Sequence, residues 1–391
     1  RPPGAAPPPP PPPTRHHPPP RVPPSIYPCC PPPLEHATPT TDSSAARALE
    51  PLPSVKSQPA RTVEIIDGMC RIPRLDLMRG GRLHCLRVAW RLVGPKRAPI
   101  IVVLGGISAN RNVTSDQGPR GWWSGLVGRD RAIDTHHYRV LSFDWVGGSA
   151  GSSGPVPGSF GRQSFPPVSP DDQATALRWI LGQIDIKRIR GFVGASYGGM
   201  VALAFAARYP QCLERLVVLS AADRPHALAT AWRSVQRRIV RLGLTNGAGD
   251  EALSIARGLA MTTYRSPEEF DARFAGPATF AEDFHRFPVD DYLEARGADF
   301  VSRIVPESYL CLSESIDLQD VDADKIRTPT TLVAVRQDQL VPLVQMRDLA
   351  RRLADGCRLV ELDSLFGHDA FLKEEDALAP VFVEALAGEL S

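Results

Sequence analysis

Ser196 lies at the centre of a G-x-S-x-G pattern, residues 194–198, between two apolar segments. The segment before it, 188–193, has the composition of a short buried strand, and the Ala- and Leu-rich segment after it, 200–208, is typical of a helix. A serine on a sharp strand-to-helix turn exposes its hydroxyl, and small neighbours allow the close backbone approach that such a turn requires. The pattern therefore predicts an activated serine nucleophile at position 196.

A serine hydroxyl needs a general base to remove its proton and a further group to orient that base. Asp338 follows a predicted strand at 330–335, and His368 follows the last predicted strand at 358–362. Both side chains are therefore expected at the carboxyl ends of strands, on the same sheet edge as Ser196. The chain order Ser, Asp, His is that of α/β-hydrolase triads. We predict Ser196, Asp338 and His368 as the catalytic residues.

Each partner has competitors in the chain. The histidines that compete with His368 are His136, His137 and His285. The acids that compete with Asp338 are Asp223 and Asp363. The position after the last strand favours His368, and the position after strand 330–335 favours Asp338.

Acyl chemistry at a serine also needs hydrogen-bond donors for the oxyanion of the tetrahedral intermediate. The backbone N–H of Tyr197, directly after the nucleophile, is one candidate donor. The second is expected in the loop after the apolar strand 100–104, at Gly106 or Ile107. The alternative for this glycine pair is a tight turn without a catalytic role.

These residues must be positioned by an alternation of strands and helices. Strands are predicted at 82–92, 100–104, 138–145, 188–193, 213–219, 330–335 and 358–362, and helices at 171–184, 200–208 and 344–353. Such alternation favours an α/β fold with a mostly parallel sheet and helices on both faces. The segment from about 225 to 320 has helical patterns and few strand signals, which predicts a helical cap insertion (225–320) between the two parts of an α/β-hydrolase core (61–224 and 321–391).

The first sixty residues differ from the rest in composition. They hold 22 of the 40 prolines, so this segment is predicted to be a disordered tail without a core of its own, and a ligand for a proline-recognising domain is the functional alternative. The seven cysteines are scattered, which favours free thiols in a reducing cytoplasm. A net charge of +2, with no long apolar run and no metal-binding motif, argues against a nucleic-acid or membrane partner and against a metal site.

Several stretches of the chain resemble motifs of one enzyme family. They are the glycine-rich loop 151–155 (Gly-Ser-Ser-Gly-Pro), the serine turn 194–200, the stretch 234–238 (Ser-Val-Gln-Arg-Arg), the stretch 262–266 (Thr-Thr-Tyr-Arg-Ser) and the segment 367–372 (Gly-His-Asp-Ala-Phe-Leu). Together they resemble the homoserine O-acyltransferase family of the α/β-hydrolase fold, from about residue 75 to the end of the chain.

This resemblance implies ping-pong acyl transfer in methionine biosynthesis. Ser196 would take an acyl group from acyl-CoA, a co-substrate rather than a cofactor, and pass it to the hydroxyl of L-homoserine. Arg237 would bind the carboxylate of the amino acid, Tyr264 would assist, and Asp369 would hold its ammonium group. The family also implies a homodimer, for which Leu228, Trp232 and Val235 are candidate contact residues.

The chain departs from the family pattern in the loop after strand 100–104. The family has His-Ala-Leu-Thr-Gly there, whereas this chain has Gly-Gly-Ile-Ser-Ala at 105–109, followed by Asn-Arg-Asn-Val. Arg111 in this loop is predicted to pair with the free carboxylate of a succinyl group, which favours a succinyl over an acetyl donor. L-Serine is an alternative acceptor, an esterase or thioesterase hydrolase is an alternative enzyme, and a non-catalytic binding protein is the remaining alternative.

Overall fold

An eight-stranded sheet, ordered β1-β2-β6-β3-β7-β8-β11-β12, runs through the part of the chain that the computed structural model describes. That part comprises residues 62–115, 121–158, 165–281, 284–353 and 356–387, so the predicted tail, 1–60, lies outside it. The strands are β1 (Glu64–Asp76), β2 (Arg82–Gly94), β3 (Ile100–Leu104), β6 (Arg139–Phe143), β7 (Gly191–Ala195), β8 (Leu216–Leu219), β11 (Thr330–Val335) and β12 (Cys357–Leu362).

The sheet is parallel from β6 to β12, and β1 and β2 extend it by antiparallel pairing. The five strands β3, β6, β7, β8 and β11 are buried along their whole lengths. This burial on both faces explains why they read as continuous apolar runs rather than as alternating patterns. The predicted α/β-hydrolase fold with a mostly parallel sheet is confirmed.

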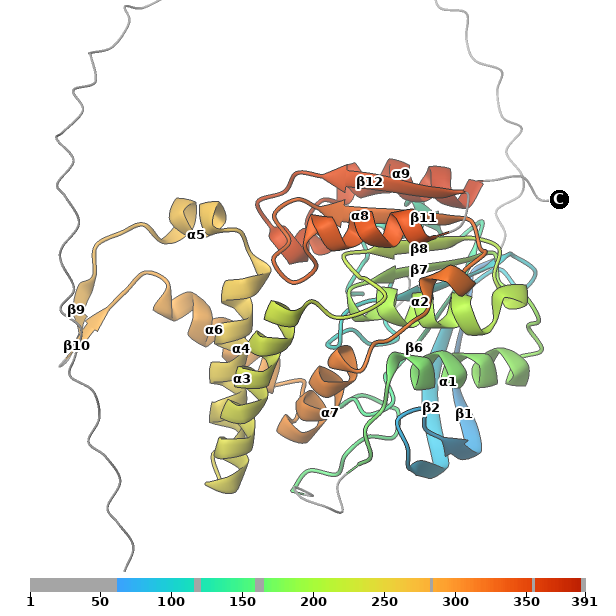
Figure 1. Ribbon diagram of the computed structural model, residues 1–391. Helices are drawn as coiled ribbons and strands as arrows, with labels where there is room; N and C mark the ends of the chain where they lie inside the picture. Colours follow the sequence, from blue (N-terminus) through green and yellow to red (C-terminus); the bar gives the residue numbers. More distant parts are fainter. Residues whose placement is uncertain (1–61, 116–120, 159–164, 282–283, 354–355, 388–391) are drawn as a thin grey trace, which may run out of the picture. The chain divides into compact units, whose positions relative to one another are not determined.

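Helices cover both faces of the sheet (Figure 1). The core on one face includes side chains from α1 (Pro170–Gln183), α2 (Tyr197–Arg208) and α8 (Leu343–Arg352). The core on the other face includes Phe382 and Leu386 of α9 (Glu375–Ala387), together with Trp123. Successive residues of β3 alternate between these two cores, because side chains of a strand point to opposite faces.

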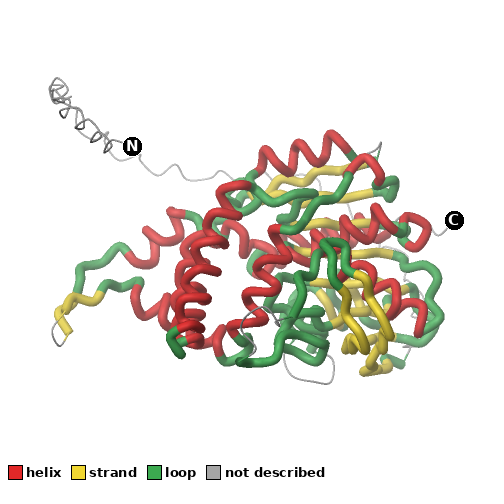
Figure 2. Tube along the Cα trace, turned by 60° about the horizontal axis from the view of Figure 1, so that its bottom comes forward, coloured by secondary structure: helices red, strands yellow, loops and turns green. Residues whose placement is uncertain are grey.

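Between β8 and β11 the chain forms a helical insertion, which we call the cap (Figure 2). It contains α3 (Ala227–Thr245), α4 (Gly249–Tyr264), α5 (Pro267–Phe274), the hairpin of β9 (Thr279–Ala281) and β10 (Phe284–Arg286), α6 (Asp290–Val301) and α7 (Pro306–Asp317). A separate apolar core holds the cap together, with Val240, Leu253, Phe300 and Tyr309 among its members. Ile107, in the loop after β3, packs against both this core and that of the α1 face.

The remaining short elements lie in connections. They are β4 (Val127–Gly128), β5 (Ile133–Asp134) and the 3-10 turns η1 (Pro210–Cys212), η2 (Ala323–Lys325) and η3 (Gly367–Leu372). No helix in the described ranges is long and apolar enough to span a membrane.

Besides the short strands β4, β5, β9 and β10, two long elements of the core were not predicted from the sequence. β1 carries Gly68 and Pro73, which weaken a strand pattern, and most of its residues are not buried because it is the edge strand. Proline lacks the backbone donor that a central strand needs, so an edge is the place where a sheet tolerates it. The second element is α9, whose Pro380 interrupts a helical pattern.

The serine turn depends on glycines at positions where a side chain would press against backbone atoms. A Cβ on Gly194 would lie 2.3 Å from the carbonyl oxygen of Gly198, and one on Gly198 would lie 2.3 Å from that of Leu104. Backbone atoms cannot move aside as a flexible side chain can. The strand-to-helix turn is therefore packed backbone against backbone.

We expect Gly194→Ala to lower the free energy of unfolding by about 1–3 kcal/mol, because the added methyl overpacks this turn. Gly182→Ala in α1 is the matched control, since its Cβ would meet only a side-chain nitrogen of Arg178 at 3.6 Å. That control should leave stability unchanged or raise it by up to about 1 kcal/mol through helix propensity. Urea titration measures both, and an equal effect of the two substitutions would contradict the packing argument.

Candidate active site

Ser196 stands in a strained backbone conformation between β7 and α2. Its φ and ψ angles are 54° and −121°. The N–H of Ser196 donates to the carbonyl of Leu219 at 2.9 Å, and the N–H of Gly198 donates to the carbonyl of Gly105 at 2.8 Å. These bonds to two neighbouring strand ends hold a conformation that costs about 1–3 kcal/mol for a residue with a side chain.

The structure brings the three predicted catalytic side chains together. Ser196 Oγ lies 2.8 Å from His368 Nε2, and His368 Nδ1 lies 2.8 Å from Asp338 Oδ2. The other carboxylate oxygen of Asp338 accepts backbone N–H bonds from Leu340 and Val341, at 2.8 and 3.0 Å. Asp338 is fully enclosed, so its carboxylate is fixed against the imidazole.

The competing residues are placed elsewhere. His285 lies on β10 in the cap and is exposed, and His137 pairs with Asp134. Among the competing acids, Asp363 lies 3.5 Å from Arg336, while Asp223 forms ion pairs with Arg224 and Arg352.

The protonation of His368 is set by opposing effects. Burial alone would lower its pKa, but the charge and hydrogen bond of Asp338, with the charge of Asp369, hold the pKa above its ordinary value of 6.5. The positive charge of Arg233 acts in the lowering direction. An imidazole held in this way can take the Ser196 proton and is stabilised when it becomes a cation.

Of the predicted oxyanion donors, Tyr197 directly follows the serine, and the roles of Tyr197, Gly106 and Ile107 stay predictions. Tyr197 is the first residue of α2, so its N–H has no partner within that helix. The bond from Gly198 to Gly105 ties the loop that carries Gly106 and Ile107 to the serine turn. Trp145 fixes the same loop, because its indole N–H donates to the carbonyl of Gly106 at 3.0 Å.

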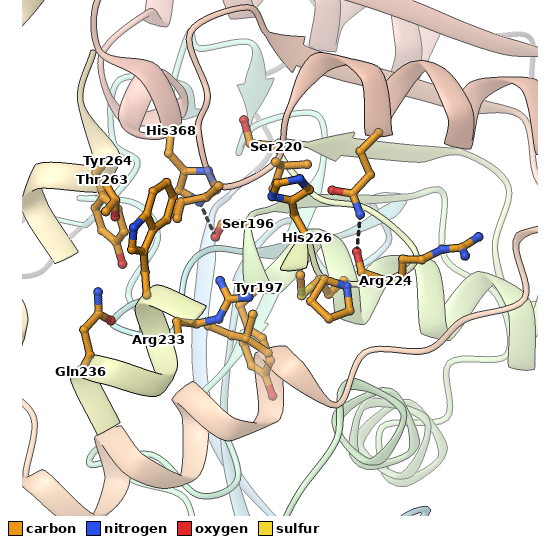
Figure 3. Close-up of a pocket in the computed structure, with 17 residues that line it drawn as sticks. Ser196, Tyr197, Ser220, Arg224, His226, Arg233, Gln236, Thr263, Tyr264 and His368 are labelled. Carbon is orange, nitrogen blue, oxygen red and sulfur yellow. Dashed lines mark hydrogen bonds between the residues drawn. The ribbon is translucent and has the colours of Figure 1, made fainter. Parts of the chain in front are cut away.

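A pocket above Ser196 is enclosed by the cap and by the loops after β8 and β11 (Figure 3). Its lining includes polar and aromatic side chains from several elements: Ser196, Ser220, Arg224, His226, Trp232, Arg233, Gln236, Thr263, Tyr264, Gln345 and His368. The strand ends supply the reacting groups, and α3 and α4 of the cap supply the opposite wall.

Comparison with known proteins identifies the family. The alpha/beta hydrolase fold family matches residues 99–375. The homoserine O-succinyltransferase of Xanthomonas campestris is 41% identical over 311 residues, which cover 79% of this chain and 81% of that protein. The chain belongs to the homoserine O-acyltransferase family. Its predicted membership is thereby confirmed, as is its assignment as an enzyme of this type.

Other members of this family differ in donor and acceptor. The serine O-succinyltransferase of Litchfieldella anticariensis is 33% identical, covering 80% of this chain and 95% of that protein. Among solved structures, a homoserine O-acetyltransferase from Bacillus anthracis has a TM-score of 0.74 at 17% identity, over 84% of this chain and 99% of that one. At that identity the structural match shows the shared fold.

The acyltransferase pocket contains Arg233 rather than Arg237. Arg237 is buried, and its Nη1 donates to the carbonyl of Ser313 at 2.9 Å and to Asp317 at 2.6 Å. Arg233 lies one helical turn earlier on α3, contacts the same Asp317, and lines the pocket. The carboxylate-binding role of Arg237 stays a prediction. The sequence could have indicated Arg233 as a pocket residue through its spacing of four residues from Arg237, because this spacing places both side chains on one helix face.

Of the other two acceptor-binding candidates, Tyr264 lines the pocket and Asp369 is not among the lining residues. The Tyr264 ring lies 5.7 Å from the His368 ring, centroid to centroid. Asp369 is buried and lies 3.2 Å from Nε of Arg265, so a cation already faces its carboxylate. The role of Asp369 as the ammonium ligand stays a prediction.

Arg111 does not reach the acyltransferase pocket. Its guanidinium pairs with the enclosed carboxylate of Asp144, and its Nε lies 3.3 Å from Asp67 on β1. Asp144 also accepts the backbone N–H of Gly151, so the Arg111–Asp144 pair fixes the glycine-rich loop after β6. Two carboxylates, those of Asp144 and Asp67, thus already pair with this arginine. The contact between Arg111 and a succinyl carboxylate stays a prediction.

Removing the charge at Asp338 should lower the pKa of His368, because burial then acts without the opposing carboxylate. For Asp338→Asn we expect labelling of Ser196 by a fluorophosphonate to slow by about 10³–10⁴-fold. In the unaltered protein, labelling should rise with pH through an apparent pKa above 6.5, and in the variant this midpoint should move down.

Asp363→Asn is the matched control, since Asp363 is exposed and lies close to His368 in sequence. It should leave both the labelling rate and its pH midpoint unchanged. A loss of labelling in this control but not in Asp338→Asn would contradict the assignment of Asp338.

Proposed function

We propose that the protein transfers a succinyl group from succinyl-CoA to the side-chain hydroxyl of L-homoserine, in methionine biosynthesis. The observation that carries this proposal is the hydrogen-bonded arrangement of Ser196, His368 and Asp338 beneath a wall of cap residues. Serine acyl chemistry needs the hydrogen-bonded triad. Transfer to an acceptor other than water needs the wall of cap residues.

In the first half-reaction, Nε2 of His368 takes the proton from Ser196 as Oγ attacks the thioester carbonyl. The oxyanion accepts hydrogen bonds from the N–H of Tyr197 and from the loop that holds Gly106 and Ile107. The carbon–sulfur bond then breaks, and the departing CoA thiolate takes the proton from His368. The product is a succinyl ester on Ser196.

In the second half-reaction, His368 takes the proton from the hydroxyl of L-homoserine, which attacks the ester carbonyl. The bond to Ser196 Oγ breaks, and His368 returns its proton to that oxygen. Both half-reactions balance in atoms and electrons without a cofactor. We therefore propose acyl-CoA as co-substrate and no cofactor. An acyl-CoA donor also fits the proposed cytoplasmic location.

The cap supports transfer over hydrolysis. Trp232, Tyr264 and Ile316 contribute apolar surface to the wall facing Ser196, together with Leu340 from the loop after β11. A site closed by such side chains restricts water at the ester and leaves room for an acceptor with matching groups. The similar proteins act on homoserine or serine with succinyl or acetyl donors, which supports an acceptor and a donor of these kinds.

We further propose a homodimer formed through the outer face of the cap. Leu228, Val235 and Leu242 of α3 are 46–67% exposed, and Ile255 of α4 is 57% exposed. Such a run of large apolar side chains on neighbouring helices is costly to leave in water and suits a symmetric contact.

The function is tested by measuring CoA release from succinyl-CoA and acetyl-CoA with L-homoserine, L-serine or no acceptor. We expect turnover with succinyl-CoA to require L-homoserine and to yield O-succinylhomoserine, with a single burst of CoA when no acceptor is present. Full-speed CoA release without acceptor would instead identify a hydrolase. A preference for L-serine would reassign the acceptor.

The dimer is tested by sedimentation of Leu242→Glu and Val235→Glu. Each places a charge in the proposed contact, so both should shift the protein from dimer to monomer. Val383→Glu is the control, because Val383 is 54% exposed but lies on α9 of the core. A monomeric unaltered protein, or equal dissociation of the control, would contradict the proposed face.

A further inference from the structure

A buried arginine directly after α4 joins the cap to the turn that carries the general base. Nε of Arg265 lies 3.2 Å from Oδ2 of Asp369, the residue after His368. The guanidinium carbon of Arg265 also lies 5.3 Å from the centre of the Phe366 ring, which is a cation–π contact. The side chains of Arg265 and Asp369 are only 9% and 11% exposed. This arginine therefore contacts the chain both before and after the base.

Further hydrogen bonds hold the same junction against both catalytic loops. The N–H of Ser266 donates to the carbonyl of Leu365 at 3.2 Å, just before the turn that carries the base. The side-chain amide of Gln339, the residue after the triad carboxylate, donates to the carbonyl of Arg265 at 3.1 Å. The backbone of Arg265 is thus fixed relative to both the acid and the base of the triad.

A second carboxylate holds the guanidinium from the cap side. Nη1 of Arg265 donates to both carboxylate oxygens of Glu269, at 3.1 and 3.2 Å. The Glu269 side chain is only 8% exposed, and it also accepts a bond from Nη1 of Arg273 at 2.9 Å. Together with Asp369 these side chains form a chain of alternating charge, so that each buried charge has an opposite neighbour.

Several charges act on the imidazole of His368. The titratable and charged groups around it come from the loops after β8 and β11, from α3 and α4 of the cap, and from its own turn: Arg224, His226, Asp338, Arg233, Tyr264 and Asp369. Burial and the charge of Arg233 act to lower the pKa of His368, whereas the charges of Asp338 and Asp369 act to raise it. The two carboxylates outweigh the opposing effects, and that pKa lies above its ordinary value.

The two carboxylates act on the base in different ways. Both ring nitrogens of His368 are already bound, to Ser196 and to Asp338, so Asp369 acts on the imidazole through its charge. A base whose protonated form is stabilised too strongly stays protonated at neutral pH and cannot take the serine proton. A cation paired with Asp369 opposes this stabilisation, because its charge acts on the imidazole in the opposite direction.

We propose that Arg265 is a positioning residue for the general base: it holds the turn of His368 against the cap and offsets the negative charge of Asp369 beside the imidazole. This inference rests on the proposed serine acyl chemistry and adds a residue outside the triad on which the base depends. It also accounts for a carboxylate that directly follows the base in the chain without keeping the imidazole protonated.

The test is the pH dependence of Ser196 labelling by a fluorophosphonate, which needs neither an acyl donor nor an acceptor. For Arg265→Gln we expect the midpoint of labelling to rise by about 1 pH unit, because the charge of Asp369 is then no longer offset. Asp369→Asn should move the midpoint down. The double variant loses both charges, so its midpoint should lie between those of the two single variants.

Two further variants separate the charge of Arg265 from a merely structural role. Arg265→Lys keeps a cation beside Asp369, so its midpoint should stay near that of the unaltered protein. Arg273→Gln is the matched control, because Arg273 pairs with the same Glu269 but is 42% exposed and lies at the outer end of the chain of charges. It should leave the midpoint unchanged. Thermal unfolding checks that each variant is folded.

An unchanged or lowered midpoint in Arg265→Gln would overturn the proposal, as would an equal shift in Arg265→Lys. If Arg265→Gln does not fold, Asp369→Asn still decides, since an unmoved midpoint in that variant would show that Asp369 exerts no charge effect to be offset. These outcomes leave the labelling of the unaltered protein intact. If the unaltered protein is not labelled at all, the proposed function itself fails.

Discussion

The left-handed backbone at Ser196 is the constraint on which the site depends. A φ of 54° is unfavourable for serine, and it persists because β7 and α2 are anchored on both sides of the turn. The anchors are backbone bonds to Leu219 at the end of β8 and to Gly105 at the end of β3. The parallel sheet thus fixes where the serine hydroxyl points, and the neighbouring strands β11 and β12 deliver Asp338 and His368 to the same edge. The packing of the sheet therefore also positions the nucleophile.

The fold and the triad could be predicted because their signals are local. Buried strands read as continuous apolar runs, and a functional side chain directly after such a run must lie at the carboxyl edge of the sheet. The edge strand β1 gave no such signal, since Pro73 and its exposed residues resemble a loop. The partners of Arg111 could not be predicted for a different reason. Arg111 stands in the right loop, yet its partner Asp144 is supplied by another strand end. Ion pairs between distant parts of the chain decide which arginine is available, and single-sequence patterns do not contain that information.

The same reasoning separates Arg233 from Arg237. Both lie on one face of α3, and a sequence motif favours the second. Asp317, some eighty positions later on α7, binds both, and of the two only Arg233 lines the pocket. The charge beside the pocket therefore depends on Asp317, Arg233 and Arg237 together rather than on any one of these side chains.

Helix α7 joins the cap to the catalytic turn. Its Ser315 hydroxyl lies 2.6 Å from the hydroxyl of Tyr197, the residue that follows the nucleophile in the chain, and two residues later Asp317 binds the arginines of α3. The Tyr197 ring is buried and packs against Trp145. A rigid outward swing of the cap would have to break all of these contacts at once. Exchange of reactants is therefore easier through small rearrangements at the rim, where exposed Arg224 lies, than through wholesale opening. Helix α7 thereby keeps the pocket tightly closed without requiring the cap to move.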